Sequence, residues 1–449
     1  MKSRLLLYTF VAALGGLLFG FDTAVISGTI PFITEYFRLN DVSLGWAVSS
    51  ALIGCILGAL FVGRPADVWG RRTMLKVMAV LFFVSAVWTG LATAFSGFII
   101  ARFIGGIAVG GASVLSPMYI SEIAPAGKRG RLVATAQLAI VIGILTAFFS
   151  NYLLVDSGDN NWRYMFLAEG IPAGVFFVLL FFVSRSPRWL VKVDRLEEAR
   201  AVIRSVDAAV DVDKAVAEIL QSIDKEAFAH LGVLFKKPYL RLVLIGTAVG
   251  MFNQFTGINI VMYYTPSIFR SAGFSDSASL LQTVLIGATN LVSTVIAMTI
   301  IDRVGRKFLL LMGALGMTVF LGLFAAAYLS SAFGGYVLLV CLIGFVAFFA
   351  ASQGVVIWVI LSEMFPNNIR ARASSIGSFS HWLFNATTSF LFPVVSSMLG
   401  IGAVFMFYAV ATLASFFFFK RFLIETKGRS LEELEHIVLL KEESTPGDR

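Results

Sequence analysis

Long apolar segments recur along the whole of this 449-residue chain and limit what it can fold into. We recognise twelve, each about 20 residues long, which is the length that an α-helix needs to cross a bilayer core. Because 58% of the residues are hydrophobic and only 14% are charged, a soluble fold would expose a very large apolar surface. We therefore expect an all-α integral membrane protein, and we exclude a disordered chain and a disulfide scaffold. The segments lie near residues 5–30, 42–63, 73–95, 97–120, 130–154, 162–183, 239–267, 277–300, 307–330, 335–361, 371–396 and 400–423.

Residues 185–238 interrupt this pattern between the sixth and seventh segments. They are rich in charged side chains at helical spacing, among them Glu197, Glu198, Arg200 and Arg204. Such a stretch predicts short, water-exposed helices on one side of the membrane.

The distribution of Lys and Arg predicts the orientation of the chain. If both termini are cytoplasmic, only Arg38, Arg163 and Arg270 lie on the opposite side, and Arg102 lies within an apolar segment. All other Lys and Arg residues are then cytoplasmic, as the positive-inside rule requires. The net charge of +8 faces the anionic cytoplasmic leaflet, so no nucleic-acid partner is needed to explain it.

Loop sequences are repeated in the two halves of the chain. The stretch 63–72 follows the second apolar segment, and the similar stretch 302–307 follows the eighth. Glu122 follows the fourth segment as Glu363 follows the tenth, each with a Ser before it and an Arg about two turns after it. The repetition predicts a duplicated transporter of two pseudo-symmetric six-helix bundles with its site between the halves. The expected parts are an N-terminal bundle (1–184), a cytoplasmic linker of short helices (185–238), a C-terminal bundle (239–424) and a cytoplasmic tail (425–449).

Several motifs occur together and in order. Residues 15–28 read GGLLFGFDTAVISG, residues 102–106 read RFIGG, residues 253–259 read NQFTGIN, and residues 425–433 read ETKGRSLEE. Through them the chain resembles, over nearly its whole length, the sugar porters of the major facilitator superfamily. It is similar to the bacterial proton-coupled xylose symporters more than to the facilitative glucose transporters. The resemblance implies the major facilitator fold, with short cytoplasmic helices between and after the halves, and sugar transport.

Four positions depart from the pattern of the family. The family motif PESPRWL is here SRSPRWL, with Arg185 in place of Glu, which is expected to weaken a cytoplasmic lock. Asn253 replaces one Gln of a pair, Val355 stands where the family has Pro, and His381 stands where related symporters often have Gln. These last three touch the expected sugar site and leave the identity of the sugar open.

Two charged residues within apolar segments carry the prediction of proton coupling. Asp22 and Arg102 are each costly in a bilayer unless they are paired or solvated. An Asp beside an Arg stays ionised, whereas the same Asp moved away into a low dielectric takes up a proton. A conformational change can therefore couple protons to sugar, and the resemblance implies that an Asp at this position goes with symport. The alternative is a fixed ion pair that only holds two helices together.

Glu169 is a second carboxylate in apolar surroundings. One Arg cannot neutralise two carboxylates, so one of them is expected to be protonated for part of the cycle. The resemblance implies a coupling role for Glu169, and a protonated packing residue bonded to the backbone is an equal alternative. The expected proton-coupling residues are thus Asp22, Arg102 and Glu169.

The sugar site is expected to combine amides with aromatic rings. A sugar hydroxyl both donates and accepts, as Asn and Gln do without net charge, and aromatic rings cover the apolar faces of the sugar. A straight helix would point Gln254 and Asn259 in different directions, so Gly257 between them is the expected place of a break. For an isolated amide, an interhelical hydrogen bond is the alternative. The candidates are Phe19, Gln137, Gln254, Asn259, Asn290, Trp358, Trp382 and Asn385, with Asn253 and Gln353 as suspects. His381 is expected to be neutral and hydrogen-bonded, and the alternative is that it titrates near neutral pH.

A second set of charges lies in the loops on the cytoplasmic side. The resemblance implies an intracellular lock that holds the inner gate shut in the outward-facing state. The alternative is a set of loops that only fix topology, but topology needs Lys and Arg alone, so the acids favour the lock. The expected gate residues are Asp67, Arg71, Glu122, Arg129, Asp302, Arg306, Glu363, Arg370 and Glu425.

Together these features predict a proton-coupled symporter that imports a neutral monosaccharide, a pentose or a hexose, by alternating access. A passive facilitator is the nearest alternative, and a non-transporting sugar sensor is disfavoured by the short tail after the last segment. An intramembrane enzyme would need a nucleophile–base or metal constellation, which the sequence does not offer; Cys55 and Cys341 lie in apolar runs, and no metal or cofactor is expected. The expected partners are the monosaccharide, protons and the lipid bilayer of a bacterial inner membrane, with no nucleic acid, and the protein is expected to work as a monomer.

Overall fold

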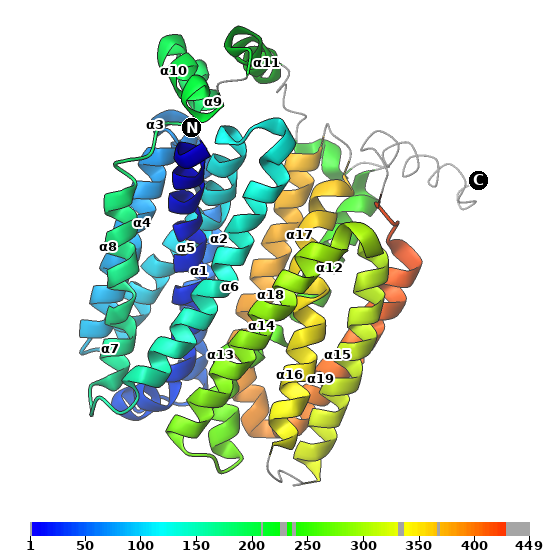
Figure 1. The fold of residues 1–449 in the computed structure, drawn as a ribbon. Helices are drawn as coiled ribbons and strands as arrows, with labels where there is room; N and C mark the ends of the chain where they lie inside the picture. The colour runs from blue at the N-terminus through cyan, green and yellow to red at the C-terminus, as the bar shows by residue number, and fades with distance from the viewer. Residues whose placement is uncertain are drawn as a thin grey trace. The chain divides into compact units, whose positions relative to one another are not determined.

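The computed structural model describes residues 2–207, 210–224, 231–235, 239–330, 336–365 and 369–427. All regular structure within these ranges is helical, and none of it is β-strand. Twelve helical segments are long and apolar enough to cross a membrane, and each coincides with a segment predicted from the sequence (Figure 1). The prediction of an all-α, multi-pass membrane protein is confirmed. Of the expected tail 425–449, only Glu425, Thr426 and Lys427 lie within the described residues.

The chain forms two compact units. Unit 1 comprises Met1–Ala227 and Tyr263–Gly287, and unit 2 comprises Phe228–Met262 and Ala288–Arg449. Each unit is described by itself below. The boundaries expected at residues 184, 238 and 424 stay a prediction.

Unit 1 is a helix bundle in which glycines allow close packing. Helix α1 packs against α6 and α5, and α2 and α4 pack against α5. A Cβ at Gly106 or Gly110 of α5 would collide with the backbone carbonyl of Ala51 or Cys55 of α2, so these glycines let the two backbones touch. The helices are α1 (Lys2–Phe37), α2 (Asp41–Phe61), α3 (Gly63–Trp69), α4 (Arg71–Leu91), α5 (Phe95–Ile123), η1 (Ala126–Lys128), α6 (Arg129–Leu154), α7 (Asn161–Ala168) and α8 (Gly170–Leu179).

Three short helices follow the sixth span, as the charged stretch predicts. They are α9 (Pro187–Lys192), α10 (Leu196–Val206) and α11 (Val212–Asp224). Ser186 caps α9 through its hydroxyl, which accepts from the Trp189 N–H, and Pro187 occupies the first turn. A small apolar core that includes Trp189, Leu190 and Val216 joins the three helices, and their charged faces stay in water.

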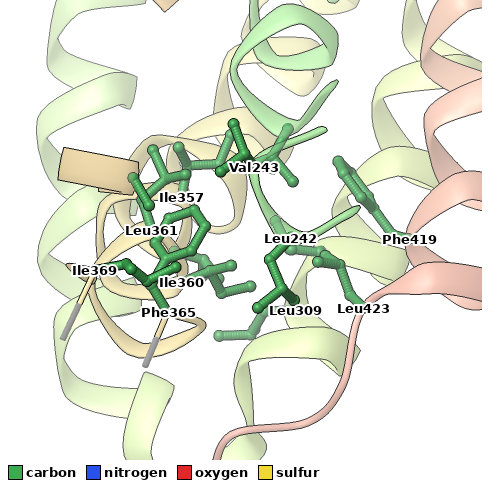
Figure 2. Packing of buried hydrophobic residues seen from close by; sticks show 14 of the residues in the cluster. Leu242, Val243, Leu309, Ile357, Ile360, Leu361, Phe365, Ile369, Phe419 and Leu423 are labelled. Carbon is green, nitrogen blue, oxygen red and sulfur yellow. The ribbon is translucent and has the colours of Figure 1, made fainter. Parts of the chain in front are cut away.

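Unit 2 contains the remaining spans. Helix α15 packs against α19 and α16, and α12 packs against α18. Figure 2 shows an apolar cluster of this unit, where Leu242, Leu309, Ile357, Phe419 and Leu423 from four helices and the segment after α19 meet. The helices are η2 (Leu231–Phe235), α12 (Tyr239–Gln254), α13 (Ile258–Ser271), α14 (Asp276–Val304), α15 (Arg306–Leu329), α16 (Val337–Ala350), α17 (Gln353–Glu363), α18 (Arg370–Leu399) and α19 (Ile401–Phe422), with the residues 263–287 of α13 and α14 belonging to unit 1.

Three spans are interrupted, and a candidate polar residue lies at each interruption. Glu169 lies between α7 and α8, Gln254 is the last residue of α12, and Gln353 is the first residue of α17. The break after α12 contains Gly257 with φ +80°, a backbone conformation that side chains with a Cβ rarely adopt. The break expected at Gly257 is confirmed, and interrupted helices are where transporters place their sites.

Candidate functional site

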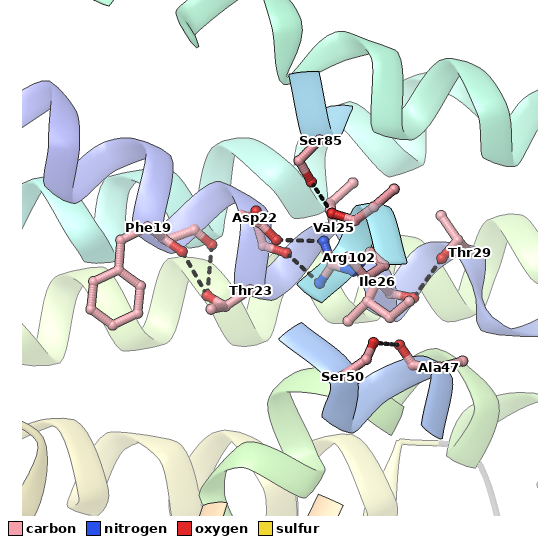
Figure 3. A network of polar contacts seen from close by, with 12 residues as sticks. Phe19, Asp22, Thr23, Val25, Ile26, Thr29, Ala47, Ser50, Ser85 and Arg102 are labelled. Atoms are coloured by element: carbon pink, nitrogen blue, oxygen red, sulfur yellow. Dashed lines mark hydrogen bonds and ion pairs between the residues drawn. The ribbon is translucent and has the colours of Figure 1, made fainter. Parts of the chain in front are cut away.

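The buried ion pair of Asp22 and Arg102 lies at the centre of unit 1. Asp22 is in the middle of α1 and is 0% exposed; Arg102, on α5, is 2% exposed. The Arg102 NH1 group donates to Asp22 Oδ1, and its NH2 group donates to the backbone carbonyl of Asp22 at 3.2 Å (Figure 3). The two charges thus satisfy each other where water does not reach, which offsets much of the cost of placing either one in the membrane.

The ion pair does not use all of the hydrogen-bonding atoms of its two side chains. Asp22 Oδ2 and Arg102 Nε are buried and hydrogen-bond to no described residue. Glu169, 1% exposed, interacts electrostatically with both Asp22 and Arg102, and its Oε1 atom also has no described partner. The site therefore holds two carboxylates and one guanidinium in an enclosed space, so that ionising both carboxylates leaves one negative charge uncompensated.

Close packing fixes the position of the ion pair. A Cβ at Gly105 of α5 would lie 2.6 Å from Asp22 Oδ2 and would also collide with the Ser85 hydroxyl of α4. That hydroxyl donates to the Ala101 carbonyl at 2.8 Å, and the Arg102 guanidinium lies 5.5 Å from the centroid of the Phe166 ring. The Asp22 carboxylate of α1 thus lies against α5, and α4 is bonded to the same stretch of α5.

An amide network spans the break of the seventh span in unit 2. Asn259 Nδ2 donates to Gln254 Oε1 at 2.6 Å, and Gln254 Nε2 donates to Asn253 Oδ1 at 2.8 Å. Asn253 Nδ2 in turn donates to Gln353 Oε1 at 3.4 Å. Gln353 is 0% exposed and its Nε2 group has no described partner. The chain of amides therefore ends on a buried NH2 group that donates to no described residue.

His381, which the sequence predicts to touch the site but not to bind the sugar, lies beside this network. Its Nδ1 atom is 2.9 Å from Gln254 Nε2. Its Nε2 atom is 3.3 Å from the same amide nitrogen. Since an amide NH2 group can only donate, the ring nitrogen that receives this hydrogen bond is unprotonated, and Nδ1 is the nearer of the two. The ring also packs on Trp358, with centroids 4.9 Å apart. The signal available in the sequence was the departure from Gln at this position, and likewise Gln353 was only a suspect.

Two more predicted sugar residues lie on α18, the helix that carries His381, and the Trp382 ring packs edge-on against the His381 ring with centroids 5.6 Å apart. Trp382 (5% exposed) and Asn385 (2%) are buried on α18, where Asn385 Oδ1 accepts from the Ser389 hydroxyl at 3.2 Å. Asn290 on α14 is buried as well. In unit 1, Phe19 on α1 and Gln137 on α6 are half-buried on two helices that pack together. Their role in binding stays a prediction.

In unit 1, the predicted gate residues meet at Arg71. Its guanidinium is 2.9 Å from Asp67 Oδ1 and 3.0 Å from Glu122 Oε1, and it donates to the Ala66 carbonyl at 3.1 Å. Trp189 of α9 adds a hydrogen bond from Nε1 to the Asp67 carbonyl at 3.1 Å. Arg129 is exposed and lies outside this cluster.

In unit 2, Arg306 makes the equivalent contacts. It is 3.0 Å from Asp302 Oδ1 and 3.4 Å from Glu363 Oε1, and it donates to the Ile301 carbonyl at 3.5 Å. Thr426 donates its hydroxyl to Glu363 Oε2 at 2.6 Å. The side chain of Arg370 lies outside the described residues. The repeated loop sequences thus build the same motif twice, an Arg that bridges two acids and a backbone carbonyl.

Glu425 fixes the segment after α19 to the start of α15. Its carboxylate accepts from the backbone N–H groups of Arg306 and Lys307, both at 2.9 Å, and of Lys427 at 3.0 Å. Partial burial raises the pKa of Glu425. The hydrogen bonds from the backbone N–H groups of Lys427, Arg306 and Lys307 together lower it by more than burial raises it, so the net pKa lies below the usual value. A carboxylate at a helix N-terminus is also stabilised by the helix dipole.

Comparison with known proteins identifies the family. Residues 8–438 match the family described as sugar (and other) transporter. The chain belongs to the sugar porters of the major facilitator superfamily. As a member of this family it is a transporter and not an enzyme. Within the described residues, no group of three or more His, Cys, Asp and Glu side chains is placed to hold a metal ion.

The similar proteins include sugar transporters of known structure. The chain is 41% identical over 466 residues to the D-xylose-proton symporter of Escherichia coli (strain K12), covering 95% of this chain and 94% of that protein. It is 39% identical over 453 residues to the glucose transport protein of Synechocystis sp., covering 96% of each. It matches the inward open conformation of the xylose transporter XylE from E. coli with a TM-score of 0.85 and 40% identity, covering 96% of this chain and 98% of that chain.

Proposed function

We propose that this sugar porter imports a neutral monosaccharide, a pentose or a hexose, together with a proton, by alternating access. The similarity to a D-xylose-proton symporter supports proton symport and a pentose, and the similarity to a glucose transport protein supports a hexose as well. Lys and Arg placement supports cytoplasmic termini, and the bacterial relatives support an inner membrane. The protein works as a monomer in this proposal.

The buried pair of Asp22 and Arg102 is the observation that carries proton coupling. Asp22 is ionised while Arg102 donates to it. When a conformational change separates the two, the carboxylate is left in a low dielectric and takes up a proton. The nearby carboxylate of Glu169 shares the same guanidinium, so it offers the proton a second acceptor within the same enclosed space.

The amides at the breaks of the seventh and tenth spans supply the chemistry for a sugar. Gln254, Asn259 and Gln353 can each donate and accept without adding charge, and Trp358 offers an aromatic face. In this proposal they bind the sugar together with Phe19, Gln137, Asn290, Trp382 and Asn385. The clusters around Arg71 and Arg306, with Glu425, act as the cytoplasmic gate.

The proton gradient is large enough to drive accumulation. One charge moving through about 100 mV supplies about 2.3 kcal/mol. A gradient of one pH unit adds about 1.4 kcal/mol. For one proton per sugar, this sum sustains a concentration ratio of several hundred-fold.

The test uses the purified protein in liposomes that contain a pH-sensitive dye. Xylose, glucose, galactose and fructose are added in turn to the wild type, to Asp22→Asn and to Asp156→Asn, a control that changes an exposed loop carboxylate. We expect sugar-triggered acidification in the wild type and in the control. In Asp22→Asn we expect acidification to be lost while counterflow of labelled sugar continues.

Two outcomes contradict the proposal in different ways. Counterflow without acidification in the wild type means a passive facilitator, in which Asp22 and Arg102 are a fixed structural pair. Absence of counterflow for every sugar in a correctly folded wild type means that the protein binds without transporting, or that it transports a different class of solute.

A further inference from the structure

A group of cations in unit 1 has no acidic partner. Arg71 pairs with Asp67 and Glu122, and Lys192 pairs with Asp67 at 3.0 Å. In contrast, Arg72, Lys76 and Arg185 form no ion pair with any described residue, although all three lie in the same region. We call Arg72, Lys76 and Arg185 the cationic cluster.

Contacts with the end of α8 bring the cluster together. Arg72 donates from Nε to the Leu180 carbonyl and from NH2 to the Phe181 carbonyl, both at 2.9 Å. Lys76 Nζ lies 3.3 Å from the centroid of the Phe181 ring. Lys76 experiences electrostatic repulsion from both Arg72 and Arg185, and Arg72 from Arg185. Three positive charges therefore converge at the position where the sixth span ends.

Arg185 replaces an acid that the family carries at this position. Where the family motif reads PESPRWL, this chain has SRSPRWL. The Arg185 guanidinium lies over the Trp189 ring, 5.0 Å from its centroid. This cation–π contact helps to hold the positive charge of Arg185 near Arg72 and Lys76. The substitution raises the summed charge of these three positions by two units, from +1 with Glu at position 185 to +3 with Arg185.

The cluster continues directly into a lipid-facing surface. Arg72, Lys76, Val80 and Phe83 follow one another at spacings of four, four and three along α4, and so lie on one face of the helix. Val80 is 43% exposed and Phe83 is 46% exposed, within a span that crosses the membrane. Phe182, after α8, is 67% exposed. The face thus changes from cationic to apolar within two turns, as a phospholipid changes from headgroup to acyl chain.

We propose that the cationic cluster binds the phosphate headgroup of an anionic phospholipid, whose acyl chains lie along Val80, Phe83 and Phe182. Arginine guanidinium groups bind phosphate oxygens in a bidentate manner, and lysine adds a point charge. Basic sites at the ends of spans bind anionic headgroups for this reason. Cations that only fix topology need not converge on one point, nor lie above an exposed apolar stripe.

The test compares two charge reversals of the same size. Arg185→Glu restores the acid of the family motif, and Arg131→Glu reverses an exposed cation in the first turn of α6. Each purified protein in detergent is titrated with phosphatidylglycerol, with phosphatidylethanolamine of the same acyl chains and with inorganic phosphate. Bound lipid is counted by native mass spectrometry, and thermal unfolding is followed by tryptophan fluorescence.

We expect phosphatidylglycerol to bind the wild type and Arg131→Glu with similar affinity, and to bind Arg185→Glu at least about tenfold more weakly. Lys76→Gln, which removes the charge and shortens the side chain by one atom, should show a smaller loss in the same direction. This second variant tests the site even if Arg185→Glu folds poorly.

Three outcomes would overturn the proposal. One is equal binding of phosphatidylglycerol and phosphatidylethanolamine to the wild type. Another is an equal loss of phosphatidylglycerol binding in Arg185→Glu and Arg131→Glu, since only net charge would then matter. The last is stabilisation by inorganic phosphate as large as that by phosphatidylglycerol, because the ligand would then be a soluble anion.

Discussion

Asn259 donates a 2.6 Å hydrogen bond to Gln254 across the break of the seventh span. In a straight helix these two side chains would point in different directions. The three residues between α12 and α13 turn the chain so that the amides meet, and Gly257 with φ +80° makes that turn possible. The backbone conformation of one glycine thus allows the two amides to meet.

Gly257→Ala is expected to lower both stability and sugar binding. The left-handed conformation costs a residue with a Cβ about 1–2 kcal/mol, and that Cβ would lie 2.5 Å from the Tyr408 ring, which adds overpacking of about 1–3 kcal/mol. Gly322→Ala in α15 is the matched control, since nothing lies within 4 Å of its added Cβ. Thermal unfolding and sugar counterflow would show a loss in the first variant and none in the second. Equal behaviour of the two would mean that the break does not depend on Gly257.

The contribution of His381 to stability is expected to come from its hydrogen-bond acceptor and not from a charge. Because Gln254 donates to a ring nitrogen of His381, His381→Leu leaves a buried amide donor without that acceptor, which costs about 1–3 kcal/mol. His381→Gln keeps an acceptor and should change stability by less than about 1 kcal/mol, while it shifts the preference among sugars. Thermal unfolding and competition by unlabelled sugars would measure the two effects. Equal destabilisation by Leu and Gln would contradict this interpretation.

Arg102→Gln is expected to destabilise the protein more than Asp22→Asn. Removal of the guanidinium leaves Asp22 and Glu169 buried without a cation, and breaking a buried pair in this way costs about 3–5 kcal/mol. In Asp22→Asn, Glu169 still interacts with Arg102, so part of the charge balance remains. Thermal unfolding of both variants near neutral pH is the measurement. A larger loss of stability in Asp22→Asn than in Arg102→Gln would show that the three groups do not share their charges.

Glu425→Gln is expected to weaken the contact between the segment after α19 and α15 in a pH-dependent way. The hydrogen bonds of Glu425 hold its pKa below the usual value, so the carboxylate stabilises the fold above about pH 4.3 and loses this effect as the pH falls through the lowered pKa. At pH 7 the variant should lose about 1 kcal/mol.

The difference between wild type and Glu425→Gln should therefore shrink as the pH falls below about 4. Thermal unfolding of both proteins between pH 7 and pH 3 measures it, with Asp156→Asn as a control for a carboxylate exposed in a loop. A difference that stays constant or grows with acid would contradict the role assigned to the carboxylate.

Much of the fold follows from the sequence because membrane spans are a local property. The length and polarity of each apolar segment are enough to define it, and the twelve predicted segments all form helices. The short amphipathic helices after the sixth span are predicted for the same reason, from charged residues at helical spacing. The repeated loops around Arg71 and Arg306 also follow from the sequence, because each cluster is built largely from residues close to one helix junction.

The candidate site depends on contacts that no local pattern contains. The sequence by itself determined that Asp22, Arg102 and Glu169 lie within the membrane, and that Gly257 is a place for a break. Only the tertiary structure decided that Gln353 bonds to Asn253 and His381 to Gln254, since they come from separate helices that meet through packing. It also decided that Arg72, Lys76 and Arg185 converge while Arg129 stays apart. Spans are set by the free energy of transferring each segment into lipid, whereas side-chain partners are set by how helices distant in sequence pack against one another.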